Sequence, residues 1–246
     1  MAEMSARRSK LRYRWSHRHP VHRAVVRAAN RVLPKVPFQV KYAVTDAVRR
    51  KKLPYRLLGP ESVAIQVGAP RDTLQAGRSR AMAFARRISP RGRLLVVEPD
   101  ETSVEEFRRM ANRHGLTHVS VVCAAAWSES TTLTLEIDPS HPATNFTAGS
   151  TQYSEEERAR FREIEVRAAK VDDLAADAGL GRVGLVSITT NGAETEILRG
   201  LKQTLERDRP YVCLARTGDA YAELMAGLGY ELLGEDDRGF TFRPKE

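Results

Sequence analysis

The stretch VAIQVGAP at residues 63–70 decides the fold class of this chain. It is a mostly apolar run of strand length that ends directly in a glycine, where a tight turn can begin. Similar runs recur along the chain, separated by stretches of helical periodicity. The further runs are LLVVE at 94–98, VSVVCA at 119–124, LVSIT at 185–189 and YVCLA at 211–215, and the helical stretches include 81–88 and 102–114. Apolar runs that alternate with helices predict a parallel α/β sheet, because both faces of such a sheet are buried.

The end of the chain adds an antiparallel hairpin to this pattern. Residues 230–233 and 240–242 are strand-like and flank the polar turn at 235–239. With the five parallel strands they make a seven-stranded, mostly parallel sheet. Helices are expected at 221–228 and through Ile197, Leu198 and Leu201.

The middle of the chain is less regular. Residues 132–137 alternate like a strand, and residues 139–151 have the composition of a loop. Ser154 and Glu157 have the spacing of a capping box, which predicts that a charged helix begins there.

Charge divides the chain into two parts. Residues 1–56 hold 16 Lys and Arg and two acids, a net charge of +14, whereas residues 57–246 hold 24 basic and 29 acidic residues, a net charge of −5. We therefore predict a basic helical N-terminal arm at 1–56 and a folded domain at 57–246. Within the arm, helical stripes run over 21–32 and through Val40, Ala43, Val44 and Ala47.

The basic arm suits three different roles. Short basic amphipathic helices can lie on an anionic membrane surface. The interleaved Tyr13, Trp15 and Tyr42 also allow nucleic-acid binding, which we favour less. In the third interpretation, residues 21–50 simply pack against the folded domain.

Several classes of protein are excluded by composition. Two cysteines cannot build a disulfide framework, and no run of 18 apolar residues is present to span a bilayer. The N-terminus lacks the apolar core of a secretory signal, although an Arg-rich, acid-poor start also describes an organelle transit peptide. His17, His19 and His22 have no accompanying acids or cysteines, so no metal site is expected. We expect a cytoplasmic protein, with the arm as the part that would meet a membrane.

The turns after the first two strands are the best candidates for ligand binding. In doubly wound sheets, ligands bind outside the carboxyl ends of the strands. Gly68 and Ala69 follow the first strand, although Pro70 removes one backbone donor there and the pattern G-x-G-x-x-G is not met. Glu98, at the end of the second strand, can accept hydrogen bonds from the two hydroxyls of a ribose.

A third candidate is the segment AGRSR at 76–80. It should lie at a helix N-terminus that faces the same edge of the sheet. Arg78, Arg80 or the backbone amides beside Ser79 could bind an anionic group there, or both arginines could lie in solvent.

Five short motifs follow one another between about residues 62 and 243. They are Gly68-Ala69, Val97-Glu98-Pro99-Asp100, Ala124-Ala125-Ala126-Trp127, Val171-Asp172-Asp173-Leu174 and the run NGAETEILRG at 191–200. Their order resembles that of FkbM-type S-adenosylmethionine-dependent methyltransferases. The last motif is the most specific, because it is similar to the family pattern E-G-A-E-x-E-x-L-x-G. The resemblance implies a Rossmann-like class I methyltransferase fold and leaves the basic arm outside it.

The resemblance also implies a cofactor, S-adenosylmethionine, and residues that hold it. Gly68 and Ala69 would face the methionine part, Glu98 with Pro99 would hold the ribose, and Ala125 and Trp127 would border the adenine. Trp127 has the alternative role of a large core residue. The predicted cofactor set is completed by Gln66, Pro70 and Ser79.

This chain departs from the family pattern where the family carries charge. Gln66 stands where the first motif usually has Asp, and Thr189 and Asn191 stand where the family reads K-I-D-V-E-G-A-E. Of the acids in that last pattern only Glu194 remains. The predicted catalytic residues are Thr189, Asn191 and Glu194, and His141 is interpreted as a solvent histidine in a loop.

Two functions follow from these observations. The first is methyl transfer from S-adenosylmethionine to oxygen on a small-molecule, glycan or lipid-linked acceptor. The alternative is a methyltransferase fold that no longer catalyses and serves as a binding or scaffold protein, with the basic arm on an anionic membrane or nucleic acid.

Overall fold

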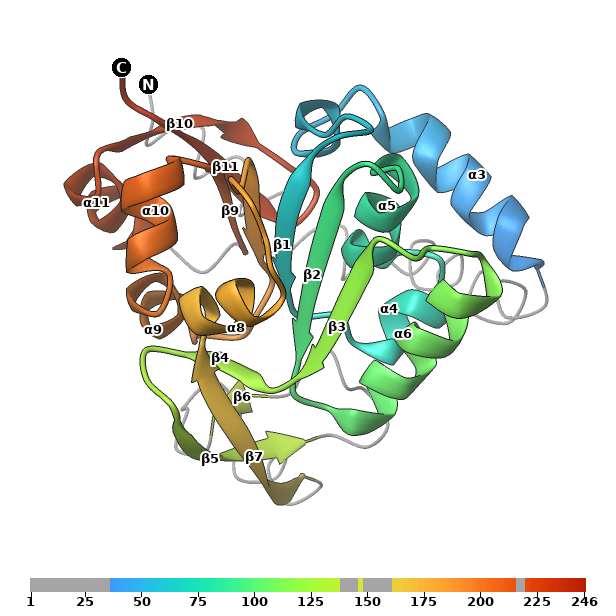
Figure 1. Ribbon diagram of the computed structural model, residues 1–246, viewed down its shortest axis with the longest axis horizontal. Helices are drawn as coiled ribbons and strands as arrows, with labels where there is room; N and C mark the ends of the chain where they lie inside the picture. Colours follow the sequence, from blue (N-terminus) through green and yellow to red (C-terminus); the bar gives the residue numbers. More distant parts are fainter. Residues whose placement is uncertain (1–35, 138–145, 148–160, 216–219) are drawn as a thin grey trace, which may run out of the picture.

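A seven-stranded sheet forms the centre of the molecule (Figure 1). The computed structural model describes residues 36–137, 146–147, 161–215 and 220–246. The strands of the main sheet are β1 (Val63–Val67), β2 (Arg93–Glu98), β3 (Val119–Cys123), β8 (Leu185–Ile188), β9 (Tyr211–Ala215), β10 (Tyr230–Glu235) and β11 (Gly239–Pro244). All seven runs predicted from the sequence are strands.

The order of the strands is β10-β11-β9-β8-β1-β2-β3. The five strands from β9 to β3 pair in parallel, and β11 runs antiparallel to both β9 and β10. The predicted fold class, a Rossmann-like and mostly parallel sheet with a C-terminal antiparallel hairpin, is confirmed.

Helices cover both faces of this sheet and enclose two separate cores. One face carries α3 (Phe38–Arg49), the 3₁₀ turn η2 (Tyr55–Leu57), α4 (Arg71–Gln75), α5 (Arg80–Arg87) and α6 (Glu101–Arg113). The other carries α8 (Val171–Asp177), α9 (Glu194–Arg199), α10 (Lys202–Asp208) and α11 (Ala220–Gly227). Because strand side chains alternate, Ala64 of β1 packs on the α5 side and Ile65 on the other. Among the helices in the described residues, none combines the length and hydropathy needed to cross a membrane.

A second, smaller sheet adjoins the end of β3. Its strands are β4 (Ala125–Trp127), β5 (Thr131–Ile137), β6 (Phe146–Thr147) and β7 (Arg162–Lys170), in the order β4-β7-β5-β6. The strand predicted at 132–137 is β5, but β4 and β7 were missed. Five of the nine residues of β7 are charged, and its five N-terminal residues are partly or fully exposed, so it lacks the apolar run of a buried strand. The charged helix predicted from Ser154 and the loop residue His141 lie outside the described residues.

The helix predicted through 197–201 is divided in two. Helix α9 ends at Arg199 and α10 begins at Lys202. A Cβ on Gly200 would lie 1.9 Å from the backbone oxygen of Trp127. Only glycine permits this close approach of α9 to β4, and that is the structural reason for the glycine that closes the NGAETEILRG motif.

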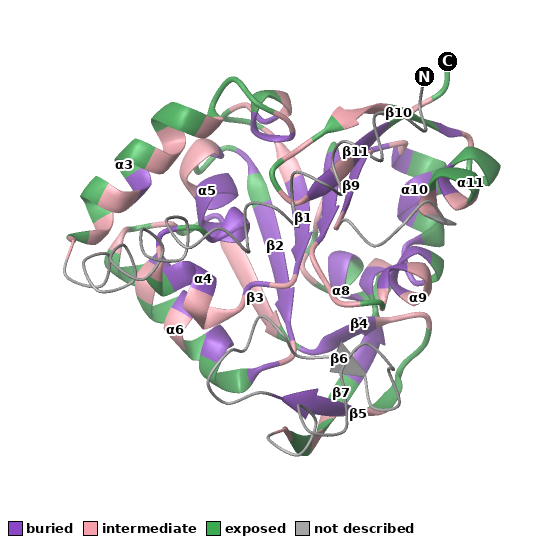
Figure 2. Cartoon of the chain, turned by 180° about the vertical axis from the view of Figure 1, so that it is seen from behind, coloured by how far each residue is buried: buried purple, intermediate pink, exposed green. Residues whose placement is uncertain are grey.

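Helix α3 packs against the domain through a face that its apolar stripe did not indicate. Tyr42 is fully buried, and its hydroxyl donates to the Leu74 oxygen at 3.2 Å. Phe38 stacks on His114 with ring centroids 4.0 Å apart. Val40 and Val44, from the predicted stripe, are 52% and 61% exposed. Figure 2 shows that exposed residues recur along α3. Residues 38–49 therefore pack on the domain as the third interpretation proposed, but with the valines outward; the helix predicted at 21–32 is not among the described residues.

Candidate functional site

The predicted site residues gather at the carboxyl edge of the sheet, where the strand order reverses. After β1 the chain crosses to β2 on one side, and β8, on the other side of β1, leads to β9. Open α/β sheets bind ligands in the crevice outside such a switch point. Gly68 follows β1 and Thr189 follows β8 at this point.

Gly68 is held between the neighbouring strand ends. Its φ is +87°, a conformation that other residues rarely adopt, and its N–H donates to the Val97 oxygen at 2.9 Å. A Cβ here would lie 2.6 Å from the Thr189 backbone oxygen. The glycine is therefore required by the close contact of β1 and β8 ends, whatever binds above it.

Gln66 and Thr189 form a neutral link across the same contact. The Gln66 amide donates from Nε2 to the Thr189 hydroxyl at 2.8 Å and to the Gly68 oxygen at 2.9 Å. The Thr189 hydroxyl lies 3.1 Å from the Val67 oxygen, to which it donates. Its proton is thus engaged by the backbone. The amide oxygen of Gln66 is buried and has no hydrogen-bond partner among the described residues, so it remains an acceptor.

Glu98 closes the edge on the side of β2. Its carboxylate accepts from the backbone N–H of Ala69 at 2.6 Å and from that of Asp100 at 3.0 Å. The side chain is buried, and burial raises the pKa of Glu98 to about 7 against the lowering effect of the two N–H donors. Asp100 itself caps α6 by accepting from the Ser103 N–H at 2.9 Å. Asp100, and not Glu98, is therefore the side chain that caps α6.

The remaining predicted cofactor residues flank Glu98 and Gly68. Pro70 precedes α4 as its N-cap, and Pro99 is half-buried directly after Glu98. Ala125 is 7% exposed and Trp127 is half-buried, both on β4, which begins two residues after β3 ends. The hydroxyl of Ser79 caps α5 by accepting from the Met82 N–H at 3.3 Å.

Two of the residues predicted to be catalytic, Thr189 and Glu194, have different partners. Asn191 is half-buried in the loop after β8. Glu194 is fully buried at the start of α9, where its Oε2 accepts from the Tyr221 hydroxyl at 2.8 Å. Its Oε1 has no partner within the described part of the chain. Glu194 thus faces α11, whereas Thr189 is bound to β1.

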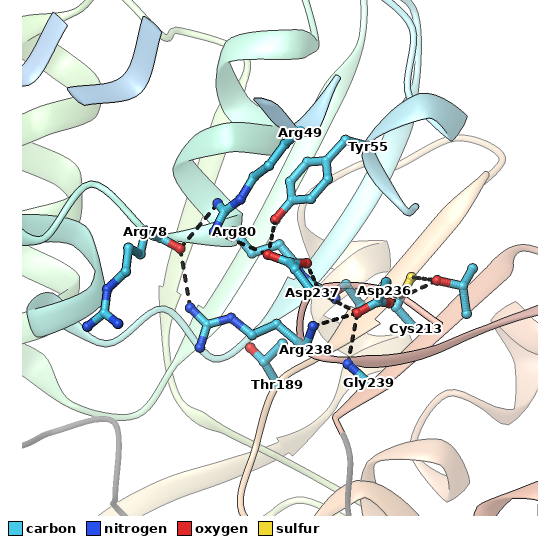
Figure 3. Close-up of polar contacts among 12 residues, drawn as sticks. Arg49, Tyr55, Arg78, Arg80, Thr189, Cys213, Asp236, Asp237, Arg238 and Gly239 are labelled. Carbon is cyan, nitrogen blue, oxygen red and sulfur yellow. Dashed lines mark hydrogen bonds and ion pairs between the residues drawn. The ribbon is translucent and has the colours of Figure 1, made fainter. Parts of the chain in front are cut away.

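Arg80 makes the largest departure from the sequence analysis. Its side chain is only 2% exposed, so it does not lie in solvent. Its guanidinium pairs with the carboxylate of Asp236 at 2.6 Å and not with a ligand. Its second carboxylate partner is Asp237, which also accepts from the Tyr55 hydroxyl at 2.8 Å and from Arg49 at 3.1 Å. Figure 3 shows this network between α3, α5 and the turn of the β10–β11 hairpin.

Sequence reasoning missed this turn as part of the site. Asp236, Asp237 and Arg238 were read only as the polar connection of a hairpin. The available signal was a connection longer than a two-residue turn with both signs of charge in it. In the part of the chain that the structure describes, no group of three or more His, Cys, Asp or Glu side chains could hold a metal ion.

The edge is compatible with the cofactor implied by the resemblance. A carboxylate has about four lone-pair positions, and only one backbone donor reaches each oxygen of Glu98. One position on each oxygen is therefore free for a ribose hydroxyl. The unpartnered Gln66 oxygen adds one more buried acceptor next to Gly68.

Comparison with known proteins gives one family and several distant structures. The sequence model of the methyltransferase FkbM domain matches residues 66–235. The FkbM methyltransferase from Methylobacillus flagellatus is 12% identical with a TM-score of 0.49, and the match covers 75% of this chain and 44% of that protein. Fibrillarin from Aeropyrum pernix, with bound S-adenosyl-L-methionine, is 11% identical with a TM-score of 0.45, covering 82% and 74%.

A third structure is the O-methyltransferase TomG from Streptomyces achromogenes in complex with SAM, 10% identical with a TM-score of 0.42, covering 85% of this chain and 79% of that one. No match was found among the curated proteins. The domain match begins inside β1 and ends at the last residue of β10, and it spans well over half of the sequence. The chain therefore belongs to the FkbM methyltransferase domain family.

Proposed function

We propose that this protein is an S-adenosylmethionine-dependent methyltransferase that acts on oxygen of a small-molecule, glycan or lipid-linked acceptor. The observation that carries the proposal is the Glu98 carboxylate, which is buried at the switch point and keeps a free acceptor position on each oxygen. The choice of oxygen rests on the family resemblance.

Each side chain at the edge has a defined task in this proposal. Glu98 would bind the ribose hydroxyls, and the Gln66 oxygen would accept from the ammonium group of the methionine part. Gly68 and Ala69 would let the cofactor approach the backbone, and Trp127 with Ala125 would border the adenine. When bound, the cofactor supplies a methyl group activated on its sulfonium.

The acceptor would lie beyond Thr189 and Asn191, on the β8 side of the switch point. Methyl transfer is a displacement in which the acceptor oxygen must be aligned with the methyl carbon, so positioning supplies much of the rate. Neutral hydrogen-bonding groups such as Asn191 can position a hydroxyl without removing its proton.

Calorimetric titration tests the cofactor. The wild-type protein should bind S-adenosylmethionine and its demethylated product, S-adenosylhomocysteine, and Glu98→Ala should weaken both at least tenfold. Glu101→Gln, an exposed acid in the first turn of α6, is the matched control and should leave both affinities unchanged. If the wild type gives no heat with either molecule, the proposal is wrong.

A second assay separates catalysis from the scaffold alternative. Radiolabelled S-adenosylmethionine should transfer methyl to an acceptor in a lysate in the presence of the wild type and not of Glu98→Ala. Cofactor binding without any transfer would favour the scaffold function, which the neutral Gln66–Thr189 link makes chemically reasonable.

We also propose that α3 rests on an anionic membrane surface. Val40, Val44 and Val48 form an exposed apolar ridge on its outer face, at 52%, 61% and 57% exposure. Exposed cations follow immediately, and the acid of the helix, Asp46, is paired with Arg86. These exposed cations are Arg50, Lys51, Lys52 and Arg56. An apolar ridge beside exposed cations fits a bilayer interface, where each cation contributes about 1 kcal/mol.

Vesicle cosedimentation of the full chain tests this surface. Binding to vesicles with phosphatidylserine should exceed binding to pure phosphatidylcholine, and the triple change of Val40, Val44 and Val48 to Ser should reduce it at least threefold. The control is Leu232→Ser on β10, because Leu232 is 57% exposed, as much as the three valines. Equal binding by the triple variant, or binding only to RNA, would contradict the proposal. A lower melting temperature of the triple variant with unchanged vesicle binding would instead indicate that another part of the chain covers the ridge.

A further inference from the structure

The turn of the β10–β11 hairpin lies at the same edge as the proposed cofactor site. Gly239 is paired with Ala215 at the end of β9, and the preceding row pairs Leu214 with Ile188 of β8 and Ile188 with Val67 of β1. The turn is therefore level with Gly68 and Thr189. It also reaches toward β8, because Arg80, which binds the turn, donates to the Ser187 hydroxyl at 3.3 Å.

The two carboxylates of the turn are fully engaged. Asp236 accepts from the Arg238 and Gly239 backbone N–H groups at 2.7 and 2.9 Å and from the Thr241 hydroxyl at 2.9 Å, besides Arg80. Asp237 is shared by Arg80, Arg49 and Tyr55. Both carboxylates therefore already have cationic partners, although the charge of Asp237 also acts on Arg238 without forming an ion pair with it.

Arg238 is a cation in this turn without an acidic partner in the described residues. Its side chain is partly buried, and its guanidinium donates one hydrogen bond, to the Arg78 backbone oxygen at 3.2 Å. Burial and the neighbouring Arg80 lower the pKa of Arg238, and the charge of Asp237 opposes this shift. Figure 3 shows the Arg238 side chain extended from the turn toward Arg78, with Thr189 of the β8 end below it in this view.

The charges around the turn do not balance. The side chains of Arg49, Arg80 and Arg238 surround two carboxylates, Asp236 and Asp237, which leaves an excess of one positive charge. Arg78 joins this network through its backbone oxygen, and Figure 3 shows its side chain directed away from the turn. A partly buried charge is costly unless a counter-charge accompanies it. The excess charge lies on Arg238, and the exposed Arg78 beside it adds a second cation; neither forms an ion pair in the described part of the chain.

We infer that Arg238 and Arg78 bind an anionic oxygen group, a phosphate or a carboxylate, carried by the methyl acceptor. A guanidinium presents paired N–H donors in a planar fork that matches two oxygens of either group. Four of the five N–H groups of Arg238 are available for it. The inference rests on the proposed function for the word acceptor, but the anion site is defined by the arginines alone.

Calorimetric titration with simple anions tests the site directly. Inorganic phosphate and malonate are titrated into the full-length protein saturated with S-adenosylhomocysteine, in a buffer without other polyvalent anions. The wild type should bind at least one of the two, which also tells phosphate from carboxylate. Arg238→Gln and Arg78→Gln should each weaken that anion at least fivefold, and Arg238→Lys should restore part of the loss.

The controls keep this inference distinct from the proposed function. Arg243→Gln, an exposed arginine on β11 paired with Glu231, should leave the anion affinity within twofold of the wild type. Arg238→Gln should also keep its affinity for S-adenosylhomocysteine; a tenfold loss there would assign Arg238 to the cofactor and overturn the inference. A wild type that binds S-adenosylhomocysteine but neither anion overturns it while the proposed function stands. If the wild type does not bind S-adenosylhomocysteine, the proposed function is contradicted. The anion titration of the wild type and of Arg78→Gln is then carried out without it and still tests the inference.

Discussion

The side chain of Glu98 has two roles: it binds the backbone of the loop after β1, and in the proposed function it binds the cofactor. Its carboxyl group has a pKa of about 7, raised by burial from an ordinary value of 4.5. In the unfolded chain the group ionises at the lower pH. Between about pH 4.5 and about 7 the folded state therefore holds a proton that the unfolded state has lost, so the free energy of unfolding falls as the pH rises through this window.

The first prediction is that Glu98→Gln changes this pH dependence. Glutamine imitates the protonated carboxyl, so the variant should lose less stability than the wild type between pH 5 and pH 8. The difference in unfolding free energy should shift by about 2 to 3 kcal/mol in favour of the variant over that range. Urea unfolding at both pH values measures it, and parallel curves would contradict the raised pKa.

Substitutions at two glycines with positive φ distinguish the cost of backbone strain from the cost of a steric clash, which is the second prediction. Gly115 has a φ of +64° and nothing within 4 Å of an added Cβ, whereas Gly68 combines a φ of +87° with a contact of 2.6 Å to the Thr189 oxygen. Gly115→Ala should cost about 1 to 2 kcal/mol of unfolding free energy, and Gly68→Ala about 3 kcal/mol or more. Chemical denaturation of both variants checks the ranking; equal losses would mean that the ends of β1 and β8 can separate.

At the scale of elements, the β10–β11 turn is held by buried ion pairs, and these differ from the exposed ion pairs on the surface of the protein. Arg80 and Asp236 are 2% and 0% exposed, while Arg91 and Glu61 pair at 72% and 68% exposure. Buried pairs are costly to break because the remaining charge has no partner and no water. Exposed pairs are screened and contribute little.

Matched substitutions at these two arginines form the third prediction. Arg80→Met should lower the unfolding free energy by about 3 to 5 kcal/mol, and Arg91→Met by at most about 1 kcal/mol. Adding Asp236→Asn and Asp237→Asn to Arg80→Met should recover part of the loss, since the unpaired charges are then removed. A loss after Arg80→Met no larger than that after Arg91→Met would show that the turn is not held by Arg80.

The sequence predicted the elements whose pattern is local. The five parallel strands of the main sheet are short apolar runs because helices cover both faces of that sheet. This composition is visible without any knowledge of partners. The strands are β1, β2, β3, β8 and β9. In contrast, β7 has one exposed side and many charges, and it becomes a strand only by pairing with β5 and β4. The orientation of α3 could not be predicted either, because it is set by contacts of Tyr42 with Leu74 and of Phe38 with His114 and not by the valine stripe.

The candidate site divides in the same way. Glu98 and Gly68 were predicted because each follows a recognisable strand. The role of Arg80 depends on Asp236, 156 positions later, and no local pattern connects the two. Arg238 was missed because its lack of an acidic partner becomes visible only when the other three arginines are placed around the turn.

At the scale of the whole molecule, the start of the described chain is part of the domain core. Tyr42 and Tyr55 are 0% and 1% exposed and belong to the same buried cluster as Phe84 and Leu74. The division of charge at residue 56 therefore does not coincide with a gap in packing, and the predicted boundary between arm and domain is open to a direct test.

Two truncated chains provide that test as the fourth prediction. Residues 36–246 keep both tyrosines, whereas residues 57–246 lack them and expose Phe84 and Leu74. Losing two large buried aromatic residues costs about 6 to 10 kcal/mol, comparable with the entire stability of an ordinary domain. The shorter chain should fail to unfold cooperatively in a thermal melt, and the longer one should melt as a single transition. Similar melting temperatures would place the boundary at residue 57.

The contact between Tyr55 and Asp237 joins positions 182 residues apart, and it sets the order in which the protein can be completed during translation. At about 5 to 20 residues per second, Asp237 leaves the ribosome roughly 10 to 40 s after Tyr55. During that interval the carboxylates of Asp236 and Asp237 are not available to pair with Arg80. Burial of Arg80 on the α5 side of the sheet is therefore unfavourable until the hairpin has been synthesised. A nascent chain that stops before the hairpin is thus left with an open core, and proteases can distinguish it from the finished protein.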